Sequence, residues 1–281
     1  MPIVKTTEVE EIVERALAED LPDITAEAIF ESRERGTASF VCKRDGVVAG
    51  HLFSRAVFAV LDGSADYEAA VEDGTVVSAG TTIARIDATV RALLSGERTA
   101  LNLLQRASGI ATITREFVRR VEGTGAAIYD TRKTAPGLRV LDKFAVVAGG
   151  GRNHRYGLHD MYLVKNNHID RAGSIAAAVE RVRARGTAHK IMVEVRNQAE
   201  LEQALVTRPD FILLDNMKIS ELRQSVLRTA GQCPLEASGG VTLDTVRAIA
   251  ETGVQRISVG ALTHSVAALD ISMKIHDKVG G

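Results

Sequence analysis

The sequence has too little of several features that would place it in a specialised class of protein. Its only cysteines, Cys42 and Cys233, are too few for a disulfide framework and lack the spacing of metal ligands. No apolar run approaches the about 20 residues that a membrane span needs. The segment 1–20 is acidic and amphipathic, unlike a signal or transit peptide. We therefore expect a cytoplasmic protein without a membrane partner.

An excess of charge of one sign is also missing. The 35 Lys and Arg residues are balanced by 36 Asp and Glu residues, which leaves a formal net charge of -1. This balance provides no overall field toward nucleic acid, so we expect no nucleic-acid partner, and anion recognition must come from local clusters. The chain of 281 residues is 45% hydrophobic and 25% charged, as in globular proteins of one large or two modest domains.

The pattern of apolar residues changes near residue 125. Spacings of three and four residues predict a helix over 9–19 and a long helix over 97–122. Between them, short β-prone runs are separated by Asp-Gly pairs, which are hairpin turn signals. The stretch 72–80 is similar to the turns of lipoyl-type β-sandwiches but has no lysine to modify, so we interpret it as scaffold.

Beyond residue 125, apolar runs alternate with helical patterns. We expect strands at 126–129, 161–164, 191–193, 211–214, 234–235 and 256–259, and helices at 138–148, 171–185, 198–206, 219–229 and 243–251. This alternation predicts a parallel sheet covered on both faces. About six such units favour an α/β barrel over the alternative, an open doubly wound sheet. No G-x-G-x-x-G motif follows these strands, which counts against dinucleotide binding.

Cationic side chains follow several of the expected strands. In α/β barrels the active site lies at the C-terminal ends of the strands, so these side chains should converge on one mouth. The cations are Arg132, Lys133, Arg155 and Lys165, and His154 can join them. Arg and Lys bind carboxylate and phosphate, and this number of cations indicates a polyanionic ligand or two anionic ligands.

Carboxylates and glycine-rich loops follow the other strands. Glu194 and Asp215 can serve Mg²⁺ or accept hydrogen bonds from sugar hydroxyls. Ser238-Gly239-Gly240 and the segment 260–265 resemble phosphate loops, because backbone N–H groups near a helix N-terminus favour anions.

Each of these features also has a simpler explanation. Arg132 and Lys133 alone would more often be surface charges, and the two carboxylates could cap helices. Lys165 at the end of a barrel strand is also where a class I aldolase carries its Schiff-base lysine. The surplus of cations and the acidic pair together favour phosphoribosyl or phosphoryl ligands.

Longer motifs run in order along nearly the whole chain. They are Glu97-Arg98-Thr99-Ala100-Leu101-Asn102, Asp130-Thr131-Arg132-Lys133-Thr134, Gly149-Gly150-Gly151 with Asn153-His154-Arg155, Lys165-Asn166-Asn167-His168-Ile169, Leu214-Asp215-Asn216-Met217, Glu236-Ala237-Ser238-Gly239-Gly240 and Ser258-Val259-Gly260-Ala261-Leu262-Thr263-His264-Ser265. Together these motifs resemble the quinolinate phosphoribosyltransferase family.

The resemblance implies a two-domain α/β fold. An N-terminal α/β sandwich domain would cover 1–108 and be joined by a C-terminal helix at 266–281. An open seven-stranded α/β barrel of the type II phosphoribosyltransferase kind would cover 109–265. A homodimer with shared active sites is implied, or a larger assembly such as a hexamer.

The resemblance also implies the reaction and its ligands. Quinolinate and phosphoribosyl pyrophosphate would react, with Mg²⁺, to give nicotinate mononucleotide, pyrophosphate and CO₂ in de novo NAD synthesis. The metal would be held mainly through the pyrophosphate, near Glu194 and Asp215, without direct protein ligands.

Site residues carry over motif by motif. Lys165, Glu194 and Asp215 would be catalytic, with the two carboxylates near the ribose hydroxyls and the pyrophosphate. The residues that hold the quinolinate carboxylates would be Arg132, Lys133, His154, Arg155 and Lys165, with Arg98 from the other subunit. The remaining substrate-binding residues, mostly at the phosphates, would be Thr131, Ser238, Gly239, Gly240, Val259, Gly260, Ala261 and His264.

The chain departs from the family pattern at a few positions. Met192 stands where the family usually has Glu, Arg196 where an acidic residue is common, and Asn166 where Asp is frequent. None of these removes an expected ligand contact. Two alternatives stay open: a molybdate-transport-associated paralogue with another anionic substrate, and a Schiff-base lyase using Lys165.

Overall fold

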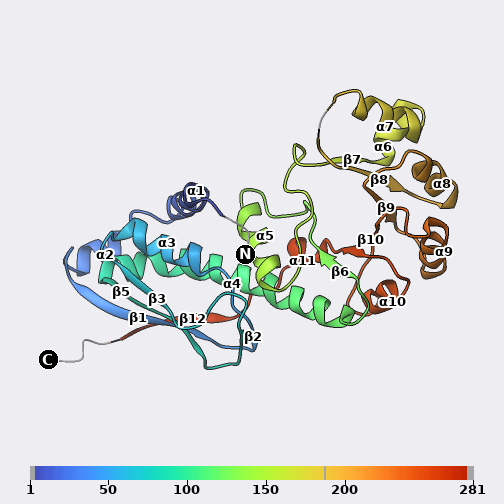
Figure 1. Ribbon diagram of the computed structural model, residues 1–281. Helices are drawn as coiled ribbons and strands as arrows, with labels where there is room; N and C mark the ends of the chain where they lie inside the picture. The colour runs from blue at the N-terminus through green and yellow to red at the C-terminus, as the bar shows by residue number, and fades with distance from the viewer. Residues whose placement is uncertain (1–3, 187, 277–281) are drawn as a thin grey trace. The chain divides into compact units, whose positions relative to one another are not determined.

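The chain folds as two compact units (Figure 1). The computed structural model describes residues 4–186 and 188–276. Within that range, unit 1 comprises Met1–Arg115, Thr134–Gly150 and Thr263–Gly281, and unit 2 comprises Glu116–Lys133 and Gly151–Leu262. No helix of the described part is both long enough and apolar enough to cross a bilayer.

Unit 1 combines helices with a small antiparallel sheet. Its elements are α1 (Thr6–Leu17), α2 (Ile24–Ile29), β1 (Arg35–Cys42), β2 (Gly46–Val47), α3 (His51–Leu61), β3 (Asp66–Ala69), β4 (Val76–Val77), β5 (Thr82–Thr89), most of α4 (Val90–Val121), α5 (Arg139–Ala148) and β12 (Ile271–His276).

The main sheet of unit 1 has the strand order β12-β1-β5-β3, and α3 and α4 lie along one of its faces (Figure 1). In β1, Ala38 and Phe40 are buried on the face that the helices cover. Gly96 of α4 allows the two helices to approach closely, because a Cβ there would lie 2.9 Å from Leu61 and 3.1 Å from Phe58. The core of unit 1 therefore lies between this sheet and these two helices.

The expected C-terminal helix at 266–281 is wrong for the described residues. Ile271–His276 forms strand β12, which pairs antiparallel with β1, with Phe40 opposite Met273. Apolar Leu269, Ile271, Met273 and Ile275 alternate along the chain, and this is the period of a strand. The segment does belong to unit 1, as a sheet edge, while 277–281 lie outside the described residues.

The division of the chain also differs from the expected boundary at 108/109. Helix α5, which we expected in the barrel domain, groups with unit 1. Arg106 of α4 forms a bidentate ion pair with Asp142 of α5, with both nitrogen–oxygen distances at 2.8 Å. At the end of α5, Gly149 lies so close to Ala111 of α4 that a side chain would not fit. These contacts tie α5 to the long helix.

Unit 2 alternates strands and helices. Its elements are β6 (Ala127–Tyr129), β7 (Tyr162–Val164), α6 (Asn166–Ala172), α7 (Ile175–Arg183), β8 (Ile191–Val195), α8 (Gln198–Val206), β9 (Phe211–Asp215), α9 (Ile219–Thr229), β10 (Leu235–Ser238), α10 (Val246–Ala250) and β11 (Arg256–Ser258). The short helix α11 (Ala261–His264) crosses from unit 2 into unit 1. All six strands expected from the sequence are present.

The strands of unit 2 form one parallel sheet in the order β6-β11-β10-β9-β8-β7. Beyond β6, Arg152 makes a single parallel bridge with Tyr129, which stands in the place of a seventh strand. The described residues show no pairing between β7 and this bridge, so the curved sheet stays open there. The open α/β barrel expected from the sequence is confirmed, with six strands and one bridge.

Candidate active site

The carboxyl ends of the unit 2 strands lie side by side, as the sequence predicts. Strand β10 is in register with both neighbours, so Ser238 stands beside Asp215 of β9 and Ser258 of β11. Ser258 in turn stands beside Tyr129, the last residue of β6. Residues that follow these positions therefore meet at one end of the sheet.

Lys165 and Glu194 form a pair at this end. The Lys165 Nζ atom lies 3.8 Å from Glu194 Oε2, and the lysine side chain is about half exposed while the carboxylate is 9% exposed. The backbone N–H of Asn166 also donates to Glu194 Oε1, at 3.5 Å. A Schiff-base lysine is usually activated by an apolar pocket or a second cation. Lys165 has a carboxylate beside it instead, so its setting resembles that of a charged ligand-binding lysine.

Asp215 and the glycine loop after β10 are held together by Asn216. The backbone N–H of Asn216 donates to the Ser238 carbonyl at 2.8 Å, and its side-chain amide donates to Asp215 Oδ1 at 3.1 Å. Gly239 and Gly240 have φ angles of +97° and +61°. A Cβ at Gly239 would collide with the Asn216 side chain. The loop conformation thus depends on glycine and leaves its backbone accessible, as a phosphate loop requires.

The predicted carboxylate-binding cations lie near one another in unit 2. Burial and the charge of Arg132 lower the pKa of Arg155. Arg155 Nη1 donates to the Met161 carbonyl at 3.1 Å, while Arg132 Nε is buried without a hydrogen-bond partner. The Lys133 backbone N–H donates to Thr131 Oγ1 at 3.0 Å and shapes this turn. The charge of Asp160 offsets the lowering of the Arg155 pKa only in part, so the pair of guanidinium groups favours an anionic ligand.

His154 is more enclosed than the other predicted ligands. Its side chain is 7% exposed, and its Nε2 atom lies 3.3 Å from Oε1 of the fully buried Glu236. Its backbone N–H donates to Asp130 Oδ1 at 2.8 Å, and the Arg155 N–H donates to its Nδ1 at 2.7 Å. The structure therefore places His154 beneath the mouth rather than at its surface.

The sequence analysis missed the buried charges in the interior of the barrel. Arg256 Nε donates to Glu236 Oε2 at 2.6 Å, and its guanidinium carbon lies 3.8 Å from the centre of the Tyr129 ring. Ser258 Oγ also donates to Glu236. Glu236 sits between the apolar residues Leu235 and Ala237 of strand β10, which ends with Ser238. A lone carboxylate in an apolar run was the available signal, because a buried charge needs partners.

Two predicted site residues belong to unit 1. Arg98 is exposed on α4, and His264 ends α11, where its Nδ1 atom lies 2.6 Å from Ser265 Oγ. In unit 2, Val259 donates its backbone N–H to the Tyr129 carbonyl at 2.9 Å, and Gly260 and Ala261 follow at the end of the sheet. The structure thus brings together Lys165 with Glu194, Asp215 with the Ser238 loop, and His154 with Arg155, and the roles of these residues, like those of Arg98 and His264, stay predictions.

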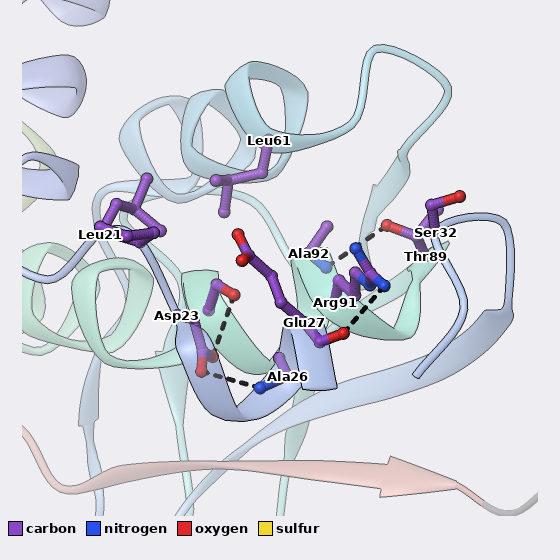
Figure 2. A pocket seen from close by; sticks show the side chains of 11 residues that line it. Leu21, Asp23, Ala26, Glu27, Ser32, Leu61, Thr89, Arg91 and Ala92 are labelled. Carbon is purple, nitrogen blue, oxygen red and sulfur yellow. Dashed lines mark hydrogen bonds between the residues drawn. The ribbon is translucent and has the colours of Figure 1, made fainter. Parts of the chain in front are cut away.

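Unit 1 has a separate hollow, shown in Figure 2, of about 550 Å³. Asp23 accepts hydrogen bonds there from the backbone of Ala26 at 2.9 Å and from Ser95 Oγ at 3.1 Å, and so caps α2. Arg91 Nε donates to the Phe30 carbonyl at 2.8 Å. The charged groups of this hollow hold α2 in place, so the hollow is structural.

Comparison with known proteins matches both parts of the chain. The family description "Quinolinate phosphoribosyl transferase, N-terminal domain" matches residues 23–108, and "Quinolinate phosphoribosyl transferase, C-terminal domain" matches residues 110–274. A Bacillus subtilis protein named "Probable nicotinate-nucleotide pyrophosphorylase [carboxylating]" is 43% identical over 90% of this chain and 88% of its own length. A Nicotiana glauca quinolinate phosphoribosyltransferase [decarboxylating] is 40% identical over 98% of this chain and 84% of its own.

Solved structures agree with these matches. The nicotinate-nucleotide pyrophosphorylase of Ehrlichia chaffeensis has a TM-score of 0.91 and 40% identity, over 98% of this chain and 100% of that one. The corresponding protein of Francisella tularensis has a TM-score of 0.91 and 36% identity, over 98% of both chains.

Proposed function

The chain belongs to the quinolinate phosphoribosyl transferase family, and we propose that it transfers the phosphoribosyl group of phosphoribosyl pyrophosphate to quinolinate with decarboxylation. The products are nicotinate mononucleotide, pyrophosphate and CO₂, in the biosynthesis of NAD. The observation that carries this proposal is the mouth of unit 2, where the Lys165–Glu194 pair and Asp215 lie at the ends of neighbouring strands, with Asp215 beside Ser238.

Quinolinate is a dicarboxylate, and the cations of the mouth suit it. Arg132 and Arg155 repel each other in the absence of an anion, because both are partly buried and both are charged. A dianion between them would replace repulsion by charge-assisted hydrogen bonds. Lys133 and Lys165 add point charges, and this supports binding of both carboxylates at once.

The phosphoribosyl donor would occupy the other half of the mouth. Glu194 and Asp215 are on adjacent strands, and carboxylates accept hydrogen bonds from ribose hydroxyls. The loop at Ser238-Gly239-Gly240 offers backbone N–H groups to a phosphate. The later segment from Val259 to Ala261 lies beside this loop through the pairing of β10 with β11.

The carboxylates also fit a role with Mg²⁺. Mg²⁺ is usually bound by one or two carboxylates together with substrate phosphates rather than by an all-protein cage. The described residues contain no group of three or more His, Cys, Asp or Glu side chains able to hold a metal by themselves. The ion would thus be held mainly through the pyrophosphate, whose negative charge it would neutralise, with Glu194 and Asp215 nearby and not as direct ligands.

The charges that develop during the reaction match the cationic and the acidic half of the mouth. The quinolinate nitrogen forms a bond to the anomeric carbon of the ribose as the bond from that carbon to pyrophosphate breaks, and positive charge develops on the sugar. Glu194 and Asp215 would stabilise that charge. The bond to the carboxylate beside the nitrogen then breaks, CO₂ leaves, and the electron pair on the ring takes a proton. Lys165 would stabilise this electron pair.

Assembly and location complete the proposal. We infer a homodimer in which Arg98 of one copy binds quinolinate in the barrel of the other, as expected from the family motif around Arg98. A hexamer made of three such dimers is the larger form expected. We propose a cytoplasmic location, which the balanced charge of the chain supports.

The reaction itself is the direct test. We expect purified protein with Mg²⁺ to release CO₂ from quinolinate only when phosphoribosyl pyrophosphate is present, with nicotinate mononucleotide as the other product. A Lys165→Ala variant is the matched control for the mouth. Absence of release by the natural sequence would refute the proposal. An imine trapped on Lys165 by borohydride would indicate a lyase instead.

A further inference from the structure

Polar and charged side chains in the interior of the barrel form a series of contacts. The series runs from Arg256 through Glu236 and His154 to the backbone of Arg155. Glu236 lies in the middle of β10 and is fully buried. Its two oxygens have different partners: Oε2 accepts from Arg256 Nε at 2.6 Å, and Oε1 faces His154 Nε2 at 3.3 Å. Barrel cores are normally filled by branched apolar residues. Burial of this carboxylate costs desolvation free energy, and this cost favours a functional role for Glu236.

The hydrogen bonds around His154 select one form of its ring. The backbone N–H of Arg155 donates to His154 Nδ1 at 2.7 Å, so this nitrogen must be an acceptor. The ring proton then resides on Nε2, where it donates to Glu236. If Nδ1 carried a proton, the Nδ1–H group and the Arg155 N–H group would both be donors and could not form this hydrogen bond. Only the neutral ring with its proton on Nε2 satisfies both contacts.

Resting on the proposed function, we propose that Glu236 is a positioning residue that sets the quinolinate-carboxylate pocket through His154 and Arg155. Glu236 fixes the tautomer of His154, and the His154 ring in turn holds the backbone N–H of Arg155. The Arg155 side chain donates to the Met161 carbonyl, and burial and the charge of Arg132 lower its pKa. A rigid backbone at residues 154–155 is therefore needed to keep the two guanidinium groups at the separation that binds two carboxylates.

Glutamate suits this position because it is an acceptor at both oxygens. Arg256 and Ser258 both donate to Glu236, as does His154 in the selected tautomer. A glutamine at 236 has one acceptor and one donor end. If its carbonyl faces His154, its amide faces the Arg256 N–H, and two donors meet. If it turns around, His154 must shift its proton to Nδ1 and loses the Arg155 N–H.

A second substitution can remove this conflict. In glutamine the amide atoms stand at the same position along the side chain as Nε of arginine. In the double variant Glu236→Gln with Arg256→Gln, the carbonyl of residue 236 can face His154 while its amide donates to the carbonyl of residue 256. Arg256→Gln alone keeps Glu236, to whose Oε2 the new amide can donate. The tautomer of His154 should thus change in E236Q only.

Two readouts test the proposal. Steady-state kinetics give KM for quinolinate and for phosphoribosyl pyrophosphate separately, with Mg²⁺ present. We expect E236Q to raise KM for quinolinate by about ten- to a hundredfold, the loss typical of a hydrogen bond to a charged group, with a several-fold smaller effect on the other KM. R256Q should stay near the natural protein, and the double variant should recover most of the loss.

Nuclear magnetic resonance supplies the readout that does not depend on activity. Two-bond ¹⁵N–¹H spectra of the histidine rings distinguish a proton on Nε2 from one on Nδ1, and comparison with a His154→Asn variant assigns the signal. We expect the Nε2–H form in the natural protein, R256Q and the double variant. In E236Q we expect the signal to shift to the Nδ1–H form or to a mixture.

The outcomes separate this proposal from the proposed function. If the natural protein releases no CO₂ from quinolinate, the function is wrong, and the tautomer spectra still decide the role of Glu236 at His154. If the natural protein is active but E236Q keeps both its tautomer and its KM for quinolinate, the positioning role is wrong. Equal increases of both KM values without rescue in the double variant would show general structural damage, and this too would overturn the proposal. Should E236Q fail to fold, Glu236→Met with Arg256→Met replaces the buried pair by apolar side chains of similar length, and an unchanged Nε2–H form with an unchanged KM for quinolinate in that variant would overturn the proposal.

Discussion

Each unit buries an arginine–carboxylate pair, and the partners of the two carboxylates differ. In unit 1, Asp142 is fully buried and accepts two hydrogen bonds from Arg106 and a third from the backbone N–H of Ala135 at 3.1 Å. Arg106 also donates to the Thr263 carbonyl at 3.2 Å. These partners are one guanidinium group and backbone, so the pair joins α4 to α5 and the segments beside them.

In unit 2, Glu236 is equally buried, but its partners are side chains. Arg256 and Ser258 hold the carboxylate, and His154 connects it to the segment that carries Arg155. Burial and charge alone do not distinguish the two pairs. The difference indicates that a buried carboxylate affects a binding site through the side chains that it orients.

The largest effect that we expect tests whether unit 1 also supplies a substrate-binding residue to the active site. Arg98→Ala in unit 1 and Lys165→Ala in unit 2 should each be nearly inactive. Co-expressed, about half of the dimers should be mixed, each with one complete site, because the barrel that keeps Lys165 receives the intact Arg98 of its partner. Activity should return to about a quarter of that of the natural protein.

The measurement is the rate of CO₂ release from the co-purified pair, with mixed dimers counted by native mass spectrometry. Each variant purified alone is the control. Abundant mixed dimers without recovered activity would show that the two residues act within one chain, and the shared-site proposal would then be wrong.

A smaller effect is expected at the carboxylates of the mouth. Asp215→Ala or Glu194→Ala should weaken use of phosphoribosyl pyrophosphate by about ten- to a hundredfold, which corresponds to about 1.5–3 kcal/mol for a hydrogen bond to a charged group. Quinolinate binding, measured by calorimetry, should change less, because removal of a carboxylate does not weaken attraction of a dianion. Equal or greater loss of quinolinate affinity would contradict the assigned roles.

The mouth was predictable from the sequence because parallel strands bring their ends to one edge. Lys165, Glu194 and Asp215 directly follow or end apolar runs, and the strands place them as expected. The pairing of Glu236 with Arg256 was not predictable in this way. The pairing depends on the register of β10 against β11 and on both side chains pointing to the same face of the sheet. The spacing of apolar residues predicts neither of these features.

The C-terminal strand was missed for a related physical reason. Strand β12 is stabilised by β1, which lies at the opposite end of the chain, with Ser39 Oγ 2.9 Å from His276 Nε2. Local propensity does not specify such a distant partner. The local pattern of the barrel strands was sufficient because each strand pairs with others of the same kind.

The two buried pairs can be compared directly by their matched amide variants. Asp142→Asn and Glu236→Gln should each lower the free energy of unfolding by about 3 kcal/mol, because each removes a fully buried carboxylate that is the counter-ion of a partly buried guanidinium group. Urea unfolding measures both losses. Only Glu236→Gln should raise the ratio of KM for quinolinate to KM for phosphoribosyl pyrophosphate. A rise of the same size in Asp142→Asn would remove the distinction between the two pairs.

The smallest effect concerns acid, and its sign follows from the environment of Glu236. Burial alone would raise the pKa of this carboxyl, but the hydrogen bonds from His154 and Ser258 and the charge of Arg256 outweigh it even when the His154 ring is neutral, so the folded-state pKa lies below the ordinary 4.5. A lowered pKa stabilises the fold at pH values above the unfolded-state pKa, and this contribution is lost as the pH falls through the folded-state value. Unfolding free energy measured from about pH 6 to about pH 3 should therefore fall less steeply in Glu236→Gln than in the natural protein below about pH 4.5. Asp87→Asn, which removes a carboxylate from an exposed ion pair with Arg35, controls for the change in net charge. Identical slopes in Glu236→Gln and the natural protein would show that Glu236 is not held charged by its neighbours.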